Sequence, residues 1–171
     1  MSEGEDGGSD QEALVGGGAG GAGEGPAGQA GARQGDERAA GGSGNYVLDA
    51  SALLCLVNGE PGAERVAAVL PSAVISAVNL AEVGTKLNEL GADGERARVL
   101  LAPLHLAVVP LDEATAFAAG ALRTATRGQG LSLGDRACLA LAVRRGAVAL
   151  TADKAWTDIC GLVGVPVELL R

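Results

Sequence analysis

Apolar residues in the second part of the chain form short runs that alternate with longer segments of helical pattern. The short runs are rich in β-branched residues and predict five strands, at 46–49, 73–76, 105–110, 147–151 and 165–167. Strands separated by helices are typical of a parallel sheet covered on both faces. We therefore expect an α/β fold of three layers, with a central parallel sheet of about five strands flanked by helices.

Three of the intervening segments carry helical patterns. One has an apolar stripe at helical spacing, formed by residues 80, 83, 84, 87, 90 and 91. A second stripe is formed by Ala114, Phe117, Ala118, Ala121, Leu122 and Ala125. Residues 137–143 are apolar all round, which suits a helix in the interior of a layered fold.

Residues 1–44 differ in composition from the remainder. They hold more than half of the chain's 28 glycines, no aromatic residue and few large apolar side chains, so they cannot bury enough surface to offset their ordering entropy. A G-x-G-x-x-G run from Gly18 to Gly23 has no strand before it and no helix after it, which argues against a dinucleotide site. We expect a disordered, Gly-rich acidic tail followed by one folded domain at 45–171.

The tail also carries most of the negative charge. It has eight acidic residues against two arginines, a net charge of −6, which leaves −2 of the total −8 for the folded domain. A nearly neutral domain can bind nucleic acid only through local positive charge. The candidates for this local positive charge are Lys86, Arg123, Arg127, Arg136 and Lys154. Each of them could instead lie on a solvated helix face.

Two further features concern the cellular compartment. No run reaches the roughly 18 apolar residues of a membrane span, and the N-terminus lacks the basic start and apolar core of a signal peptide. The three cysteines, Cys55, Cys138 and Cys160, stand singly in apolar helical patterns, which favours buried thiols over a zinc site or a disulfide. We expect a cytoplasmic protein that does not bind membranes.

Four acidic residues each close a short apolar run or open a helical one. They are Asp49 in YVLDASALL, Glu82 in NLAEVGTK, Asp135 in LSLGDRACLALA and Asp153 in VALTADKAW. A strand that ends on an acid and turns into a helix brings that acid to the carboxyl edge of a parallel sheet, where open α/β folds bind ligands. Hard oxygen ligands at this edge suit Mg²⁺ or Mn²⁺. The pattern therefore predicts a metal site.

Each acid also has a structural interpretation. Two pairs have capping-box spacing, Ser132 with Asp135 and Asn79 with Glu82, and Glu82 could instead pair with Lys86 four residues later. The other two acids could cap the helices that follow them. A cap is worth only about 1 kcal/mol, whereas four carboxylates in one pocket repel one another unless a cation joins them.

In this order and spacing, the segments YVLDASALLCLV, NLAEV, LSLGDRACLALA and LTADKAW resemble the PIN-domain nucleases, specifically the VapC-type toxins of bacterial toxin–antitoxin pairs. The resemblance covers residues 45–171 and implies a PIN-like fold. It maps the four metal-site acids of the family onto Asp49, Glu82, Asp135 and Asp153. Ser51 and Thr151 match hydroxyl positions that line such sites, and a helix cap and a strand-end hydroxyl remain their alternatives.

The resemblance implies a metal-dependent endoribonuclease that uses Mg²⁺ or Mn²⁺ to hydrolyse RNA phosphodiester bonds. It also implies a cognate small antitoxin whose C-terminal segment occupies the site, and we expect a homodimer. A metal-free mechanism through the 2′-oxygen usually needs two acid–base groups, commonly histidines, and His105 is the one histidine. We expect His105 in the core or on an edge strand.

Three alternative functions stay open. The domain could be a PIN-domain nuclease that processes RNA without being a toxin, or a catalytically silent binding module. A phosphotransfer domain with Asp49 as nucleophile is disfavoured, because no second acid and no D-x-D motif lie nearby. The 44 residues before the first strand exceed the usual start of VapC-type chains, so they are either a flexible extension or follow from a misplaced start codon.

Deletion of residues 1–44 tests the expected tail. The melting temperature should stay almost unchanged, because this segment has no apolar pattern with which to dock on the domain. Limited proteolysis should remove the same segment first. A fall of several degrees in the truncated protein would show that the segment packs on the domain.

Overall fold

The computed structural model describes residues 45–170, and the expected tail at 1–44 lies outside the described residues. Five strands form one sheet in the order β3-β2-β1-β4-β5, and every neighbouring pair is parallel. The strands are β1 (Tyr46–Leu48), β2 (Ala73–Ser76), β3 (Ala107–Val109), β4 (Val148–Thr151) and β5 (Val167–Leu169). The expected parallel α/β fold is confirmed.

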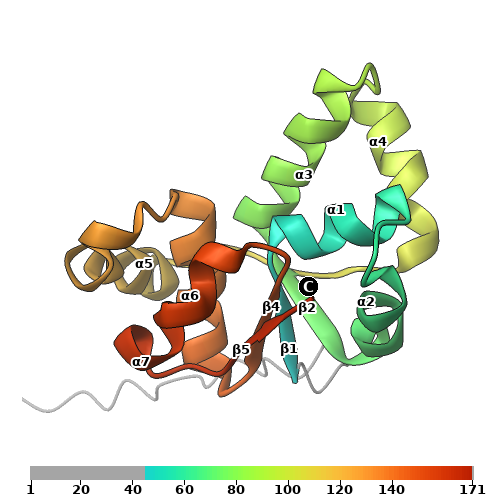
Figure 1. Cartoon of the computed structure of the whole chain (residues 1–171). Helices are drawn as coiled ribbons and strands as arrows, with labels where there is room; N and C mark the ends of the chain where they lie inside the picture. Colours follow the sequence, from blue (N-terminus) through green and yellow to red (C-terminus); the bar gives the residue numbers. More distant parts are fainter. Residues whose placement is uncertain (1–44, 171) are drawn as a thin grey trace, which may run out of the picture. The chain divides into compact units, whose positions relative to one another are not determined.

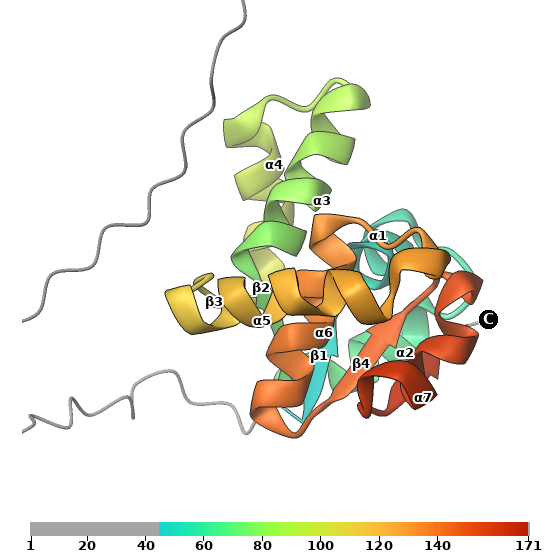
Figure 2. The same ribbon diagram turned by 90° about the vertical axis from the view of Figure 1, so that its left-hand side faces the viewer.

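Helices cover both faces of this sheet (Figure 1). One group consists of α1 (Ala50–Asn58), α2 (Ala63–Val69), α3 (Ala77–Glu89) and α4 (Gly94–Leu101). The other consists of α5 (Glu113–Ala125), α6 (Leu133–Arg145) and α7 (Ile159–Val163). Figure 2 shows that α3 and α4 rise together away from the remaining helices, as they do in Figure 1. Four short 3-10 turns complete the described part: η1 (Leu70–Ser72), η2 (Ala102–Leu104), η3 (Arg127–Gln129) and η4 (Lys154–Asp158).

The strands separate two hydrophobic cores because successive side chains point to opposite faces. Val47 of β1 belongs to the core beneath α6, whereas Leu48 belongs to the core beneath α1. Trp156 on η4 is completely buried in the first core, and its indole Nε1 has no hydrogen-bond partner among the described residues. Of residues 137–143, which the all-apolar pattern placed in the interior, Ala137–Ala142 are buried and Val143 is 48% exposed.

The apolar face predicted for α5 is wrong, although the helix itself is confirmed. Thr115 and Ala119 are its buried residues, whereas Phe117 is 72% exposed. Alanines lie on all sides of this helix, so its apolar residues do not define one face. Buried Thr126, which follows α5, donates its hydroxyl to the carbonyl of Leu122 at 2.7 Å.

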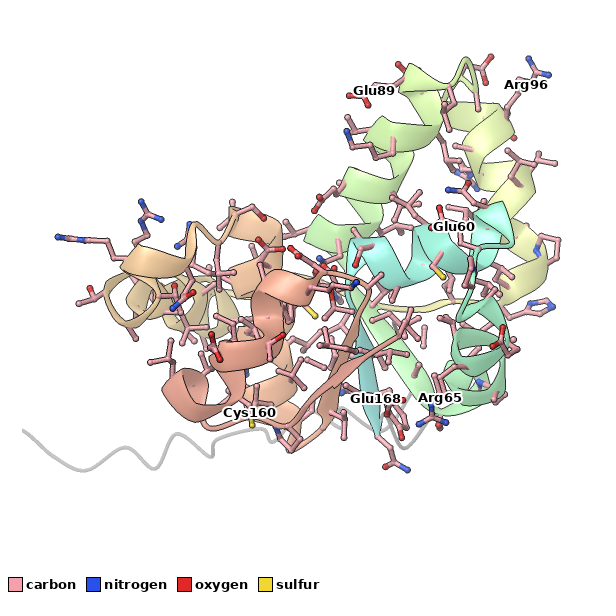
Figure 3. The ribbon with its side chains drawn as sticks, in the orientation of Figure 1. Glu60, Arg65, Glu89, Arg96, Cys160 and Glu168 are labelled. Atoms are coloured by element: carbon pink, nitrogen blue, oxygen red, sulfur yellow. The ribbon has the colours of Figure 1, made fainter. Side chains whose placement is uncertain are left out.

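Other expectations require smaller corrections. Leu90 follows the end of α3 and is 76% exposed, so it does not continue the buried stripe. His105 is exposed and adopts φ 47° at the end of η2, which shortens the strand expected at 105–110 to β3. Cys55 and Cys138 are buried as expected, but Cys160 is exposed (Figure 3).

An ion pair connects helix α2 to the edge strand β5. Arg65 of α2 and Glu168 of β5 point toward one another in Figure 3, with 2.5 Å between Nε and Oε1. Arg65 also donates to the hydroxyl of Tyr46 at 2.8 Å, so α2 is tied to β1 and β5. Both charges are partly exposed, which limits the contribution to stability. Within residues 45–170, no helix is long and apolar enough to cross a membrane.

Candidate metal site at the carboxyl edge of the sheet

The candidate site lies at the point where the strand order of the sheet changes direction. From β1 the chain adds β2 and β3 on one side, then returns to add β4 and β5 on the other. The carboxyl ends of β1 and β4 therefore border the topological switch point, where open α/β sheets bind ligands. Asp49 follows β1 directly, and Thr151 ends β4.

The Asp49 carboxylate is 3% exposed and accepts hydrogen bonds on both oxygens. Oδ2 accepts from the Ser51 backbone N–H at 3.3 Å, the Ser51 hydroxyl at 2.5 Å and the Thr151 hydroxyl at 2.9 Å. Oδ1 accepts from Asn79 Nδ2 at 3.1 Å. Asp49 thus caps α1, as its structural interpretation predicted, and also accepts hydrogen bonds from side chains of α3 and β4.

The two hydroxyls also contact the chain that leaves β4. Ser51 Oγ accepts from the Ala152 N–H at 2.9 Å, and Thr151 Oγ1 accepts from the Asp153 N–H at 3.0 Å. Each hydroxyl has one proton and lies within donating distance of Asp49 Oδ2, and the two hydroxyl oxygens also lie 3.0 Å apart, where either one could donate. The chain that leaves β4 toward Asp153 is therefore held against the Asp49 carboxylate.

Burial has an electrostatic consequence for Asp49. Loss of solvation raises the pKa of its carboxyl above the usual value, and the charge of Asp135 raises it further, although the hydrogen bonds from Ser51 and Thr151 oppose the rise. The pKa of Glu82 is also raised, first by partial burial and then by the charges of Asp49 and Asp135. Three of the four predicted acids thus repel one another across the site.

Asp135 and Asp153 each use one carboxylate oxygen as a helix cap. Asp135 Oδ2 accepts from the Ser132 N–H at 2.6 Å, which completes a capping box. Asp153 Oδ1 accepts from the Ala155 N–H at 2.9 Å at the start of η4. Both caps were predicted, and in each carboxylate the other oxygen accepts no hydrogen bond from the described residues.

Neither structural interpretation of Glu82 is observed. The N-cap of α3 is Ser76, not Asn79, and Lys86 pairs with Glu89 at 2.9 Å instead of with Glu82. Glu82 accepts no hydrogen bond within residues 45–170. Its Oε2 lies above Gly134, where a Cβ would come within 2.5 Å of it. The absence of a side chain at Gly134 therefore leaves room for the Glu82 carboxylate beside the first turn of α6.

The sequence pattern did not identify Asn79 as a contact of Asp49. It considered Asn79 only as a capping partner of Glu82, because helical spacing relates residues within one segment and not residues 30 positions apart. Asn79 is completely buried and hydrogen-bonded to Ser76, Asp49 and Gly134.

The donor set of this edge has the chemistry that a hard divalent cation requires, namely carboxylate oxygens on converging elements. In the described part of the chain, however, no three His, Cys, Asp or Glu side chains are arranged so that they could hold a metal ion. Asp49 is fixed by its four donors, whereas Glu82 has none. Ligation by a common ion therefore requires a change in side-chain positions, and no hydrogen bond from the described residues restrains Glu82 from moving.

A separate groove of about 760 Å³ lies between α3, α4 and the segment before β3. Its lining is largely apolar, and none of the four acids takes part. The hydrogen bonds and charges at the sheet edge, and not this groove, therefore define the candidate metal site.

The sequence profile of the PIN domain matches residues 46–162, which is more than half of the chain. The chain therefore belongs to the PIN domain family, and the resemblance expected from the motifs is confirmed. No significant match was found among curated protein sequences.

Solved structures with a similar fold include VapBC complexes. DNA-bound VapBC from Salmonella typhimurium matches with a TM-score of 0.60 and 20% identity, over 75% of this chain and 99% of that one. VapBC2 from Rickettsia felis, bound to a promoter DNA fragment, matches with a TM-score of 0.58 and 17% identity, over 72% and 97% of the two chains. A toxin–antitoxin complex from Klebsiella pneumoniae matches with a TM-score of 0.57 and 21% identity, over 74% and 98%. At these identities the likeness concerns the fold.

Replacement of Glu82 by Gln tests the repulsion within the site. Because the pKa of Glu82 is raised in the folded protein, its ionisation destabilises the fold as pH rises above the usual value of 4.5. Without divalent cations, Glu82→Gln should melt above the unmodified protein at about pH 7, and the difference should vanish as pH falls below 4.5.

Glu89→Gln is the matched control on the same helix. It removes a carboxylate that is attracted to Lys86, so it should leave the melting temperature unchanged or lower it slightly at neutral pH. A lower melting temperature for Glu82→Gln at neutral pH would show that Glu82 is stabilised, not repelled, in the folded protein.

Proposed function

We propose that this PIN domain is a metal-dependent endoribonuclease and the toxin of a toxin–antitoxin pair. The observation that carries the proposal is the buried Asp49 carboxylate at the switch point of the sheet. The charge of Asp135 raises the pKa of Asp49, and the charges of Asp49 and Asp135 raise the pKa of Glu82. A protein keeps such a repulsive group at a ligand-binding edge when a cation compensates it.

Mg²⁺ or Mn²⁺ suits the oxygen ligands, and when bound it would lower the pKa of a water and stabilise the charge on the leaving oxygen. Asp49 would be the fixed ligand, because its donors hold it in one orientation. Asp135 and Asp153 would contribute the carboxylate oxygen that their caps leave open, and Glu82 would be the mobile ligand. Ser51 and Thr151 would support the site by holding Asp49.

The toxin assignment is supported by the fold. The solved structures with this fold include one described as a toxin–antitoxin complex and others described as VapBC bound to DNA. We propose a cognate small antitoxin as the protein partner, RNA as the substrate, and a second copy of this chain as a further partner. The three free cysteines of the described region fit a reducing compartment, which supports a cytoplasmic location.

The antitoxin would place an Arg or Lys among the carboxylates, where the cation otherwise supplies positive charge. We also propose that an apolar helix of the antitoxin lies near α1, whose apolar residues include Leu53, Leu54 and Val57. Leu53 is completely buried, so only Leu54 and Val57 retain surface for such a contact.

Cleavage of RNA by the purified protein, free of antitoxin, tests the metal dependence. It should require Mg²⁺ or Mn²⁺, stop with EDTA and leave products with a 5′-phosphate and a 3′-hydroxyl. Asp49→Asn and Asp135→Asn should each lower the rate at least about a hundredfold, comparable with the loss of a major electrostatic contribution.

The matched control is Asp93→Asn, which changes the N-cap of α4 in the same way outside the site. Asn is as good a cap as Asp, so this variant should keep its activity and its circular dichroism spectrum. Full cleavage in the presence of chelator would exclude the proposed mechanism. Near-native turnover of either site variant would mean that the residue serves only as a cap.

Expression in a bacterial host tests the toxin assignment. Growth should stop when the intact chain is produced, and it should recover when the adjacent small reading frame is co-expressed or when Asp49 is changed to Ala. Growth arrest by Asp49→Ala would show that RNA cleavage is not the cause. Harmless expression of a folded protein that cleaves RNA would favour an RNA-processing nuclease.

A further inference from the structure

Asn79 connects the parts of the site that carry the acids. It lies in the first turn of α3, is completely buried, and directs both protons of its side-chain amide away from its own helix. Nδ2 donates to Asp49 Oδ1 at 3.1 Å and to the Gly134 carbonyl at 3.3 Å. Asn79 thereby bridges the end of β1 and the start of α6.

The orientation of this amide is determined by its neighbours. Asp49 Oδ1 and the Gly134 carbonyl both require a donor, while the Ser76 hydroxyl donates to Asn79 Oδ1 at 2.5 Å. A flipped amide would place its oxygen against two acceptors and lose both hydrogen bonds. The side chain therefore has one favourable orientation.

Capping of α3 does not explain these contacts. Ser76 is the N-cap, and its hydroxyl accepts the backbone N–H of Asn79 at 3.1 Å. The Nδ2 hydrogen bonds add nothing to that cap, because they leave the helix for β1 and α6. Their effect is to fix the position of Asp49 relative to the turn that carries Asp135.

The two oxygens of Asp49 differ in their surroundings. Oδ2 accepts from three donors of Ser51 and Thr151, whereas Oδ1 accepts only from Asn79 within the described region. Oδ1 therefore retains a free lone pair, which makes it the oxygen available to a cation. The hydrogen bond from Asn79 fixes the position of Oδ1 and the direction in which its free lone pair points.

We infer that Asn79 is a positioning residue for the metal site, an inference that rests on the function proposed above. Its amide holds Asp49 Oδ1 and the first turn of α6 at a fixed separation, and Glu82 follows it by one helical turn. Polar groups that hydrogen-bond to metal ligands typically change metal affinity by about 10- to 100-fold when they are removed.

Isothermal titration with Mn²⁺ tests this role through binding alone. Asn79→Ala should bind Mn²⁺ about 10- to 100-fold more weakly than the unmodified protein. The Mn²⁺ concentration for half-maximal RNA cleavage should rise by a similar factor. Asn88→Ala is the matched control, because Asn88 lies on the same helix and donates only to the Ala92 carbonyl at 3.4 Å. It should bind Mn²⁺ as the unmodified protein does.

Ser76→Ala provides a second variant in case Asn79→Ala does not fold. It leaves the Asn79 amide in place but removes the hydroxyl that anchors it, so Mn²⁺ binding should weaken by less than with Asn79→Ala. Asp93→Ala removes a comparable cap from α4 and should leave Mn²⁺ affinity unchanged. This pair separates the loss of a cap from the loss of positioning.

The outcomes distinguish this inference from the proposed function. If the unmodified protein binds no Mn²⁺, the proposed metal-dependent function fails. If the unmodified protein binds Mn²⁺ and the folded Asn79→Ala variant binds it equally well, the positioning role is wrong while the metal site stands. Equal binding by Ser76→Ala, where Asn79→Ala does not fold, would also overturn the role.

Discussion

The structure depends on the hydrogen bonds that surround one buried carboxylate. A carboxylate that is removed from water loses several kcal/mol of solvation unless donors replace the water. Asp49 obtains these donors from α1, α3 and the end of β4, through Ser51, Asn79 and Thr151. The same contacts join three elements at the carboxyl edge of the sheet. These donors replace only part of the lost solvation, and this loss is the largest cause of the raised pKa of Asp49. For the same reason, the proposed cation would be favourable there.

Structural and functional interpretations of the acids are compatible. A carboxylate has two oxygens, and a helix cap uses one of them. Asp135 caps α6 through Oδ2, and Asp153 caps η4 through Oδ1, so each keeps one oxygen free of the described hydrogen bonds. The caps also restrict the rotation of both side chains, which would lower the entropy lost if they bind the proposed cation. Glu82 lacks such a restraint.

Much of the fold could be predicted because strands that alternate with helices form a parallel sheet, and parallel strands that end on acids share one sheet edge. The order of the strands within the sheet was not part of that prediction. The exposed face of α5 could not be predicted, because alanines lie on all sides of the helix. In addition, a hydrophobic pattern assigns the polar Thr115 to the surface, whereas Thr115 is buried. The contact between Asn79 and Asp49 could not be predicted either, because the sheet, and not local spacing, brings residues 30 positions apart together. Cys160 was misjudged because α7 is short and packs through Ile159.

The burial of Trp156 has a practical consequence. It is the one tryptophan of the chain, its indole lies in an apolar core, and its backbone N–H donates to the Asp153 carbonyl at 3.2 Å. Indole fluorescence shifts to longer wavelength when water reaches the ring. At an excitation wavelength that only indole absorbs, the intrinsic emission of this protein therefore arises from a single position, close in sequence to the proposed ligand Asp153. The emission wavelength consequently reports, without a label, whether water reaches Trp156 in the same sample that is titrated with a cation.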